Sequence, residues 1–234
     1  ASMTSMVYLL DQILNDHKLL NKFQFFIIPV LNPDGYEYSH TNDRLWRKNR
    51  SPQEGNCFGV DLNRNFGFQW GGKGTSSDPC HPIYRGKQEN SEAESKALIR
   101  AMRKYKNQAL VYLSFHAYGQ YILTTYGYDL GKYPPHYNEM IAISTELVER
   151  MKKKFGAKYT TGSSADIFYP AAGGSDDYAA GVIQIPYSFT VELPPLIVRG
   201  ENGFVIRPED IVPIGKQALE IVQFICEKVN RNIK

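Results

Sequence analysis

Segments with a helical spacing of apolar residues alternate along this chain with short apolar runs. The helical segments cover residues 6–17, 91–106, 137–155 and 213–230. The apolar runs cover residues 23–31, 109–115 and 182–193, and their aromatic and β-branched residues are typical of buried strands. Because this alternation is characteristic of a sheet covered on both faces, the sequence predicts an α/β fold with a central mixed, largely parallel β-sheet sandwiched by helices.

Local motifs predict where some of these elements begin. Asn32-Pro33-Asp34-Gly35 has the composition of a turn and follows the run 23–31. Ser91-Glu92-Ala93-Glu94 matches a capping box, which predicts the start of the second helix. Between these motifs the chain is polar with little periodicity to about Asn90, and a loop region of this length is usually functional.

Length and charge exclude several classes of function. A chain of 234 residues with 42% hydrophobic residues can bury one large core, so residues 1–234 are expected to form a single domain. The net charge of +3 is spread along the chain without a run of five or six like charges, so nucleic acid is not an expected partner. No apolar stretch reaches the roughly 18 residues that cross a bilayer, so a membrane is not expected either. The chain begins at Ala1 inside a predicted helix, and we expect it to be N-terminally incomplete.

Two of the three cysteines lie in polar loops. Cys57 and Cys80 are surrounded by Gly, Ser, Asn and Pro, whereas Cys226 lies on the apolar face of the last helix. We expect Cys57 and Cys80 to pair, which would stabilise the fold by roughly 3 kcal/mol and indicate an oxidising compartment. Two free thiols are the alternative. Asn49-Arg50-Ser51 fits a glycosylation acceptor, but Pro52 follows it directly.

Three polar residues in or beside apolar runs are candidate functional residues. His116 and Glu192 lie at or near the ends of two predicted strands, where ligands bind in α/β folds. A lone histidine is more often an ordinary hydrogen-bonded residue. Glu192 could form a structural salt bridge, but an acid in an apolar run is usually paired or catalytic because an unpaired buried charge is costly. Arg64, beside Asn63 in a polar loop, could present its planar guanidinium to a carboxylate or could simply be solvated.

These motifs occur in a fixed order along the chain. The order is Asn32-Pro33-Asp34-Gly35-Tyr36, Arg44-Leu45-Trp46-Arg47-Lys48, Asp61-Leu62-Asn63-Arg64-Asn65, Ser114-Phe115-His116, Tyr169 before Gly173-Gly174-Ser175, and Phe189-Thr190-Val191-Glu192-Leu193. In that order they resemble the funnelin-type zinc metallocarboxypeptidases, the pancreatic carboxypeptidase A and B (M14) family, over nearly the whole chain.

The resemblance implies a role for each matched catalytic residue. His116 matches the third zinc ligand of the family, and Glu192 matches the catalytic glutamate that takes a proton from the zinc-bound water. Arg47 matches the residue that stabilises the oxyanion. Cys57 and Cys80 match the family's disulfide.

The resemblance also implies how a substrate is held. Asn63, Arg64 and Tyr169 match the group that binds the terminal carboxylate of the substrate. Arg44 and Tyr118 match residues of neighbouring subsites. A site of this kind trims peptides from the C-terminus and does not cut them internally.

Substrate preference is assigned to the segment 173–177. Local chemistry predicts a helix start with Ser175 as its cap and acids facing the positive helix end, which fits Asp177. By the resemblance, Asp176 lies on the floor of the specificity pocket, where an acid is typical of B-type enzymes. At about 4 Å and an effective dielectric of about 20, its attraction for a basic side chain is near 4 kcal/mol before desolvation. The sequence therefore predicts a preference for C-terminal Lys or Arg.

Two departures from the family pattern bear on function. The His-x-x-Glu motif that supplies the first two zinc ligands of the family is absent, as are the first strands of its sheet. We therefore expect one Zn²⁺ ion with two of its three protein ligands from a segment preceding Ala1. The loop that begins at Pro194-Pro195 and runs to Arg199 is longer than is common in the family, which affects the rim of the pocket.

Two functional hypotheses follow from these residues. The first is a secreted, zymogen-derived zinc exopeptidase, whose expected partners are peptide or protein C-termini ending in Lys or Arg, the missing N-terminal segment, and a pro-segment or protein inhibitor. The second is a metal-free domain that binds C-terminal carboxylates without hydrolysis. Serine-hydrolase chemistry is a weaker third alternative, because Ser175 lacks the G-x-S-x-G motif.

Overall fold

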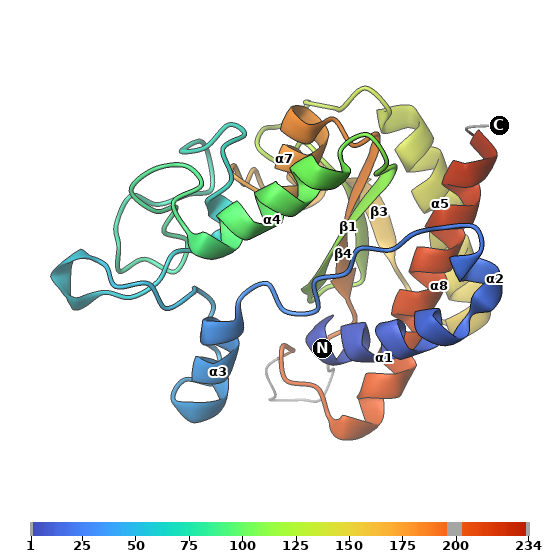
Figure 1. Ribbon diagram of the computed structural model, residues 1–234, viewed down its shortest axis with the longest axis horizontal. Coiled ribbons are helices and arrows are strands. Elements are labelled where there is room, and N and C mark those ends of the chain that lie inside the picture. Colours follow the sequence, from blue (N-terminus) through green and yellow to red (C-terminus); the bar gives the residue numbers. More distant parts are fainter. Residues whose placement is uncertain (1, 196–202, 233–234) are drawn as a thin grey trace.

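A four-stranded sheet lies between two layers of helices, with α5 and α8 on one side and α4 and α7 on the other (Figure 1). The computed structural model describes residues 2–195 and 203–232. In the order β1-β4-β2-β3, the strands are β1 (Val111–Ala117), β4 (Tyr187–Leu193), β2 (Tyr121–Thr124) and β3 (Thr160–Ser163). Two of the three strand pairings are parallel and one, β2 with β4, is antiparallel. The predicted α/β fold with a mixed, largely parallel sheet is confirmed.

The helices predicted from apolar spacing are all present. They are α1 (Ser2–Asn15), α4 (Ala93–Tyr105), α5 (Tyr137–Phe155) and α8 (Pro208–Asn232). The shorter helices are α2 (His17–Leu20), α3 (Pro33–Thr41), α6 (Ser164–Ile167) and α7 (Ser175–Tyr178), with 3-10 turns at Leu62–Arg64 and Glu54–Asn56 and a π-helical turn at Ala179–Ile183. Among the described residues, none of these helices has the length and apolarity needed to cross a bilayer.

Apolar side chains form one core on each side of the sheet. The larger core joins α1, α5 and α8 to the sheet and includes the fully buried Leu147, Phe189 and Ile221. The smaller core, on the side of α4 and α7, includes Phe66 and Tyr178. Each core buries apolar area that stabilises the fold by about 25 cal/mol per Å².

Strands β1 and β4 divide their side chains between the two sides of the sheet. Alternate residues Phe189, Val191 and Leu193 are buried in the larger core, and Leu113 and Phe115 of β1 pack against it. The intervening positions carry polar groups, and the parallel register aligns them as Tyr112 with Ser188, Ser114 with Thr190, and His116 with Glu192. One face of the strand pair is therefore apolar and the other is polar, as the period of two requires.

The apolar run 23–31, predicted to be a strand, is not one. Phe23, Phe25 and Ile27 pack against the larger core and Ile28 against the smaller core, so the alternation of a strand is retained. Within the described residues, however, no main-chain hydrogen bond joins residues 24–31 to a neighbouring segment. Side-chain alternation predicts which faces are buried, but a strand also needs a paired backbone.

Two predicted helix starts differ from the structure. Asn32-Pro33-Asp34-Gly35 begins α3 and does not form a free turn, because Asn32 Oδ1 accepts a hydrogen bond from Gly35 N at 3.0 Å and Pro33 occupies the first helical turn. The capping box at the start of α4 is not formed. Its N-cap is Glu92, and Ser91 Oγ donates to the Glu92 carboxylate at 2.6 Å. The short strands β2 and β3 were not predicted, because four residues give too little periodicity.

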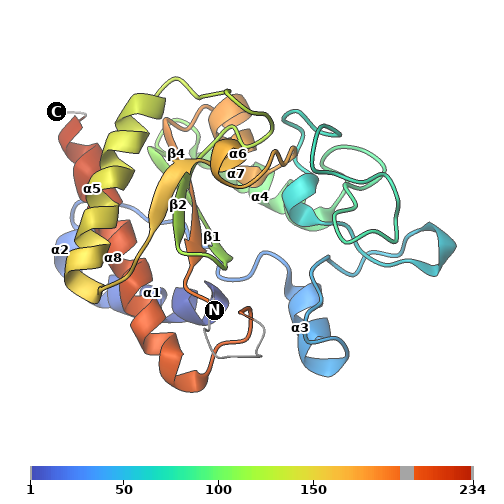
Figure 2. The same ribbon diagram turned by 180° about the vertical axis from the view of Figure 1, so that it is seen from behind.

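The long loop region from 42 to 90 is held by one disulfide and a buried amide. Cys57 and Cys80 are joined, with their Cα atoms 5.1 Å apart, so the predicted pairing is confirmed. Asn49 is buried, donates to Glu92 Oε2 at 2.8 Å and accepts from Val60 N at 2.7 Å. An amide used in this way is not available for glycosylation. In Figure 2, α3 and the loop that follows it extend away from the sheet.

Candidate active site

The centre of the site lies on the polar face of β1 and β4. His116 and Glu192 are paired residues in the register of the two strands, and Ser114 Oγ lies 2.7 Å from His116 Nε2. The Glu192 side chain carries a buried Oε2 atom without a hydrogen-bond partner among the described residues. Burial raises the pKa of Glu192, the nearby charges of His116 and Arg47 oppose this shift, and the carboxylate of Asp176 adds to it. A partly desolvated carboxylate of this kind is a suitable proton acceptor.

Arg47 is brought to this site from the loop after α3 by an ion pair with Asp61. Its Nε and Nη2 atoms both lie 2.9 Å from Asp61 Oδ2, and the side chain of Asp61 is only 4% exposed, against 47% for that of Arg47. Burial works against the charge of Arg47, but the Asp61 carboxylate outweighs it and raises the pKa, with smaller contributions from Tyr169 and Glu192. The guanidinium is thus fixed on one side and stays charged, as oxyanion stabilisation requires.

The predicted carboxylate-binding group lies on the 3-10 turn Leu62–Arg64. Asp61 caps this turn by accepting from Asn63 N at 3.1 Å. Arg64 is buried, and its Nε and Nη1 atoms donate to the main-chain oxygens of Gly74 at 2.7 Å and Asn63 at 2.9 Å. Asn63 Oδ1 accepts from Ser175 N at 3.3 Å, which connects the turn to α7.

Asp176 lies between α7 and the polar face of β4. It is buried, and its Oδ2 atom accepts from Thr190 Oγ1 at 2.9 Å, while its main-chain oxygen accepts from Ser188 Oγ at 3.0 Å. The residue is therefore fixed two strand positions from Glu192. A buried carboxylate at this place can select a cationic group, because an apolar group would leave its charge unpaired.

The predicted helix start is present as α7, with Asp177 in its first turn, but the predicted role of Ser175 as the cap was wrong. The N-cap of α7 is Gly174, and Ser175 Oγ instead accepts from Tyr112 OH at 3.0 Å. Asp177 is buried and accepts from the main-chain N–H groups of Tyr126, Gly127 and Tyr128 at 2.6–3.1 Å. Burial and the neighbouring Asp176 raise the pKa of Asp177, and the three N–H donors oppose this shift. Asp177 thus anchors the turn 126–128 to α7.

The remaining predicted residues lie at the periphery. The side chain of Tyr169 is exposed (59%) beside Phe168. Arg44 is exposed in the loop after α3. Tyr118 follows β1, joined to Ala117 by a cis peptide bond, and its ring packs edge-on against Phe204 at a centroid distance of 4.7 Å. The structure therefore brings together His116, Glu192, Asp176, Arg47 and the Asn63 turn, and Tyr169 lies near enough to Arg47 to affect its pKa. Arg44 and Tyr118 make no hydrogen bond or ion pair with these groups among the described residues. Of the loop that begins at Pro194-Pro195, residues 196–199 lie outside the described residues.

The donor set for zinc is incomplete in the part of the chain that the structure describes. Zinc in a catalytic site is held by three protein ligands. Among the described residues, no group of three His, Cys, Asp or Glu side chains could hold a metal ion. His116 can contribute one nitrogen, but the described residues alone do not fit the ion.

Several partners of the site were not found from the sequence. Asp61 stood in a recognised motif without a role. An acid two residues before Asn63, in a loop region that also contains Arg47, is a usable signal for a cap and an ion pair. The contributions of Ser114 and Thr190 follow from the period of two along β1 and β4, which places them on the face of His116 and Glu192. Gly74 carries no such signal, because only its main-chain oxygen contacts Arg64.

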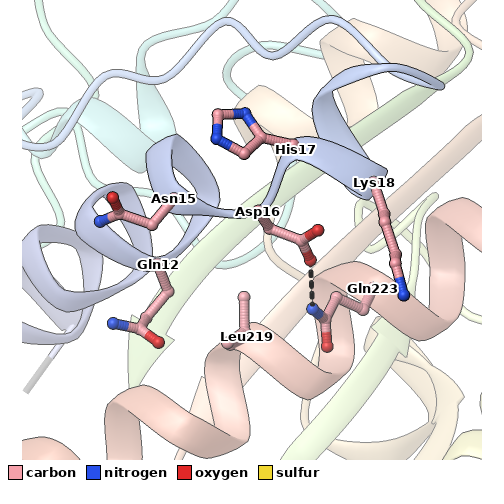
Figure 3. A pocket seen from close by; sticks show the side chains of 7 residues that line it. All are labelled: Gln12, Asn15, Asp16, His17, Lys18, Leu219 and Gln223. Carbon is pink, nitrogen blue, oxygen red and sulfur yellow. Dashed lines mark hydrogen bonds between the residues drawn. The ribbon is translucent and has the colours of Figure 1, made fainter.

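Two cavities of the described residues lie away from these groups. The larger, of about 420 Å³, is a depression where α1, α2 and α8 meet, and Figure 3 shows its polar lining, with Asp16 accepting from Gln223 Nε2 at 3.2 Å. Another, of about 340 Å³, lies beside Trp70 and Arg85. None of the predicted site residues lines either cavity.

Comparisons with known proteins identify the family to which this fold belongs. The zinc carboxypeptidase family profile matches residues 1–221. A zinc carboxypeptidase of Simulium vittatum is 37% identical over 230 residues, which cover 96% of this chain and 75% of that protein. Human carboxypeptidase O is 40% identical over 230 residues, which cover 95% of this chain and 60% of that protein. The structure of bovine thrombin-activatable fibrinolysis inhibitor, in complex with tick carboxypeptidase inhibitor, matches with a TM-score of 0.90 and 36% identity over 97% of this chain and 77% of that chain.

The chain belongs to the zinc carboxypeptidase family. It spans 51% to 75% of the length of the first four curated relatives. Relatives of comparable identity carry the names carboxypeptidase A, B and O. Membership is thus shown for the family as a whole, and substrate preference is a separate question.

Proposed function

We propose that this chain is the substrate-binding and proton-transfer part of a zinc-dependent exopeptidase that releases C-terminal Lys or Arg. The observation that carries the proposal is the polar face of β1 and β4. His116 lies beside Glu192 on this face, and β4 is connected to Asp176 through Ser188 and Thr190. A structural face would need no such row of polar groups in the middle of a sheet.

Each group has a chemical task in this proposal. Arg64 and Asn63 bind the terminal carboxylate of the peptide by charge-assisted hydrogen bonds, and Tyr169 closes over it. Arg47 stabilises the negative charge that develops on the scissile carbonyl oxygen. Glu192 accepts a proton from the attacking water and returns it to the leaving amine. Arg44 and Tyr118 contact residues further along the peptide.

His116 supplies one zinc ligand in this proposal. The other two come from a segment preceding Ala1, since the described residues do not contain them. The test is zinc content by atomic absorption, for the chain alone and after addition of a synthetic peptide that carries the family's His-x-x-Glu motif. Tight binding of one zinc ion per molecule by the chain alone would contradict this division of ligands.

Substrate preference rests on Asp176. We expect calorimetry to show that a short peptide ending in arginine binds about 100-fold more tightly than the same peptide ending in phenylalanine, which corresponds to roughly 2.7 kcal/mol. Asp176→Asn should abolish most of this preference, and Asp176→Ile should shift it toward phenylalanine. Asp34→Asn, which removes an exposed acid on α3, is the matched control and should change nothing. An arginine preference that survives Asp176→Ile would show that the pocket lies elsewhere.

A metal-free domain that binds peptide C-termini is the second candidate function, favoured by the incomplete donor set. The two functions differ in one measurement. With zinc and the His-x-x-Glu peptide present, an exopeptidase releases free arginine, which mass spectrometry detects, whereas a binding domain retains the intact peptide.

Partners and location follow from the same reasoning. The bovine relative was solved with a protein carboxypeptidase inhibitor, so a proteinaceous inhibitor or pro-segment that covers the site is a fitting partner of this chain as well. The Cys57–Cys80 disulfide requires an oxidising compartment, which supports secretion.

A further inference from the structure

Arg85 connects several segments behind the carboxylate-binding turn. Its Nη1 atom donates to Gly71 O at 3.1 Å and to Thr75 Oγ1 at 3.3 Å. Its guanidinium carbon lies 5.0 Å from the centre of the Trp70 ring, and its main-chain oxygen accepts from Trp70 Nε1 at 3.1 Å. Arg85 thus fixes both ends of the short segment 71–75.

The segment 71–75 in turn holds the guanidinium of Arg64. Gly74 O accepts from Arg64 Nε at 2.7 Å. Gly74 has a φ of +68°, and a Cβ atom there would lie 2.1 Å from Pro170 O, so the segment is also pressed against the chain that carries Tyr169. A shift of residues 71–75 would therefore move Arg64 relative to its expected ligand.

One hydrogen-bond donor of the Arg85 guanidinium, the Nε atom, is buried without a partner among the described residues, and this burial is costly. An unsatisfied buried donor costs about 1–3 kcal/mol. A buried unsatisfied donor calls for an explanation, and a role in positioning the segment 71–75 supplies one.

We propose that Arg85 is a positioning residue for substrate binding, which orients Arg64 through the segment 71–75. The proposal rests on the proposed function of Arg64 as the group that binds the terminal carboxylate. Arg85 does not contact the substrate itself, so its removal should weaken recognition of the carboxylate without changing the preference for arginine.

The test compares two probes on the full chain: a short peptide ending in arginine with a free carboxylate, and the same peptide with a C-terminal amide. The dissociation constant of the amide divided by that of the free acid measures how strongly the carboxylate is recognised. We expect Arg85→Met to lower this ratio about tenfold, the effect of one weakened charge-assisted hydrogen bond. Arg85→Lys, which keeps one donor, should restore part of it. Arg100→Met on the exposed face of α4 is the control for loss of one positive charge and should leave the ratio unchanged.

Thr75→Val provides an independent variant if Arg85→Met does not fold, because it removes one acceptor of the same contact and should lower the ratio in the same direction by a smaller factor. A wild-type protein that does not distinguish acid from amide would contradict the proposed function. A wild-type protein that does so, together with folded Arg85→Met or Thr75→Val variants that retain the full ratio, would overturn the role of Arg85 alone.

Discussion

The two faces of the β1–β4 strand pair carry out different tasks with the same backbone. Phe189, Val191 and Leu193 on one face are fully buried in the larger core. Thr190 and Glu192, which alternate with them, face α7 and the site. Side chains on the apolar face need only fill the volume of the core, whereas each polar group on the other face needs a hydrogen-bond partner of defined geometry.

This difference shows how the sequence keeps the site residues in the correct strand register. Because the side-chain period of a strand is two, a slip of one residue would place Glu192 in the larger core and Phe189 toward Asp176. The apolar face therefore fixes the register that the polar face requires. Stability should depend mainly on one face and recognition mainly on the other, and the following variants test that division.

The largest effect is expected on the apolar face. Phe189→Ala removes a fully buried ring from the larger core and should lower the free energy of unfolding by about 3–5 kcal/mol, measured by urea denaturation. Where the variant remains folded, its preference for arginine-ending peptides should be unchanged, because Phe189 does not contact the site. A folded variant that loses this preference would show that the two faces are not independent.

A smaller effect is expected on the polar face. Thr190→Val removes the hydroxyl that donates to Asp176 Oδ2 and leaves a buried carboxylate oxygen without this donor. The free energy of unfolding should fall by about 1–2 kcal/mol, and arginine-ending peptides should bind several-fold more weakly as Asp176 loses its orientation. Thr190→Ser keeps the hydroxyl and is the matched control. Equal binding by the valine and serine variants would remove Thr190 from the recognition of substrate.

The strands show how much of the fold could be predicted from the sequence. A strand was predicted over residues 182–193, but only Tyr187–Leu193 forms β4, since Ala179–Ile183 is a π-helical turn. β4 forms because β1 and β2 pair with it on either edge. Residues 23–31 are equally apolar, yet the strand predicted for them is absent. No segment among the described residues pairs with their backbone. Apolar periodicity specifies a buried face, but pairing depends on which other segments are present, and a local pattern does not contain that information.

The site shows a corresponding limit. His116 and Glu192 could be found because polar residues in apolar strands are unusual, and Arg64 because of its motif. Asp177 was correctly placed at a helix start, but its partners were missed, since a sequence cannot show that the main-chain N–H groups of residues 126–128 converge on it. Gly74 was missed for the same reason, because it acts through its main-chain oxygen. Side-chain chemistry is visible in a sequence, whereas main-chain contacts between distant loops appear only in the fold.

The smallest effect concerns a charged residue behind the apolar face. Glu220 of α8 is buried (2% exposed) and binds Arg150 and Lys154 of α5. Burial opposes its charge, but the hydrogen bonds and charges of Lys154 and Arg150 outweigh this and lower the pKa of Glu220. A lowered folded-state pKa stabilises the fold above the unfolded-state pKa, near 4.3, and the contribution is lost as the pH falls through the folded value.

Glu220→Gln should therefore cost about 1 kcal/mol in the free energy of unfolding at pH 7, because both cationic partners are half exposed and screened by solvent. The difference from the wild type should shrink below about pH 4 as Glu220 is protonated in both states. Glu146→Gln is the matched control, since Glu146 also connects α5 to α8 through Lys228 but is exposed, and its loss should cost less than about 0.5 kcal/mol. Both variants should leave the binding of arginine-ending peptides unchanged, because the charges behind the apolar face contribute to stability alone. If Glu220→Gln changed that binding, the side of the sheet that carries the larger core would also affect the polar face. Stability and recognition would then not be divided between the two faces.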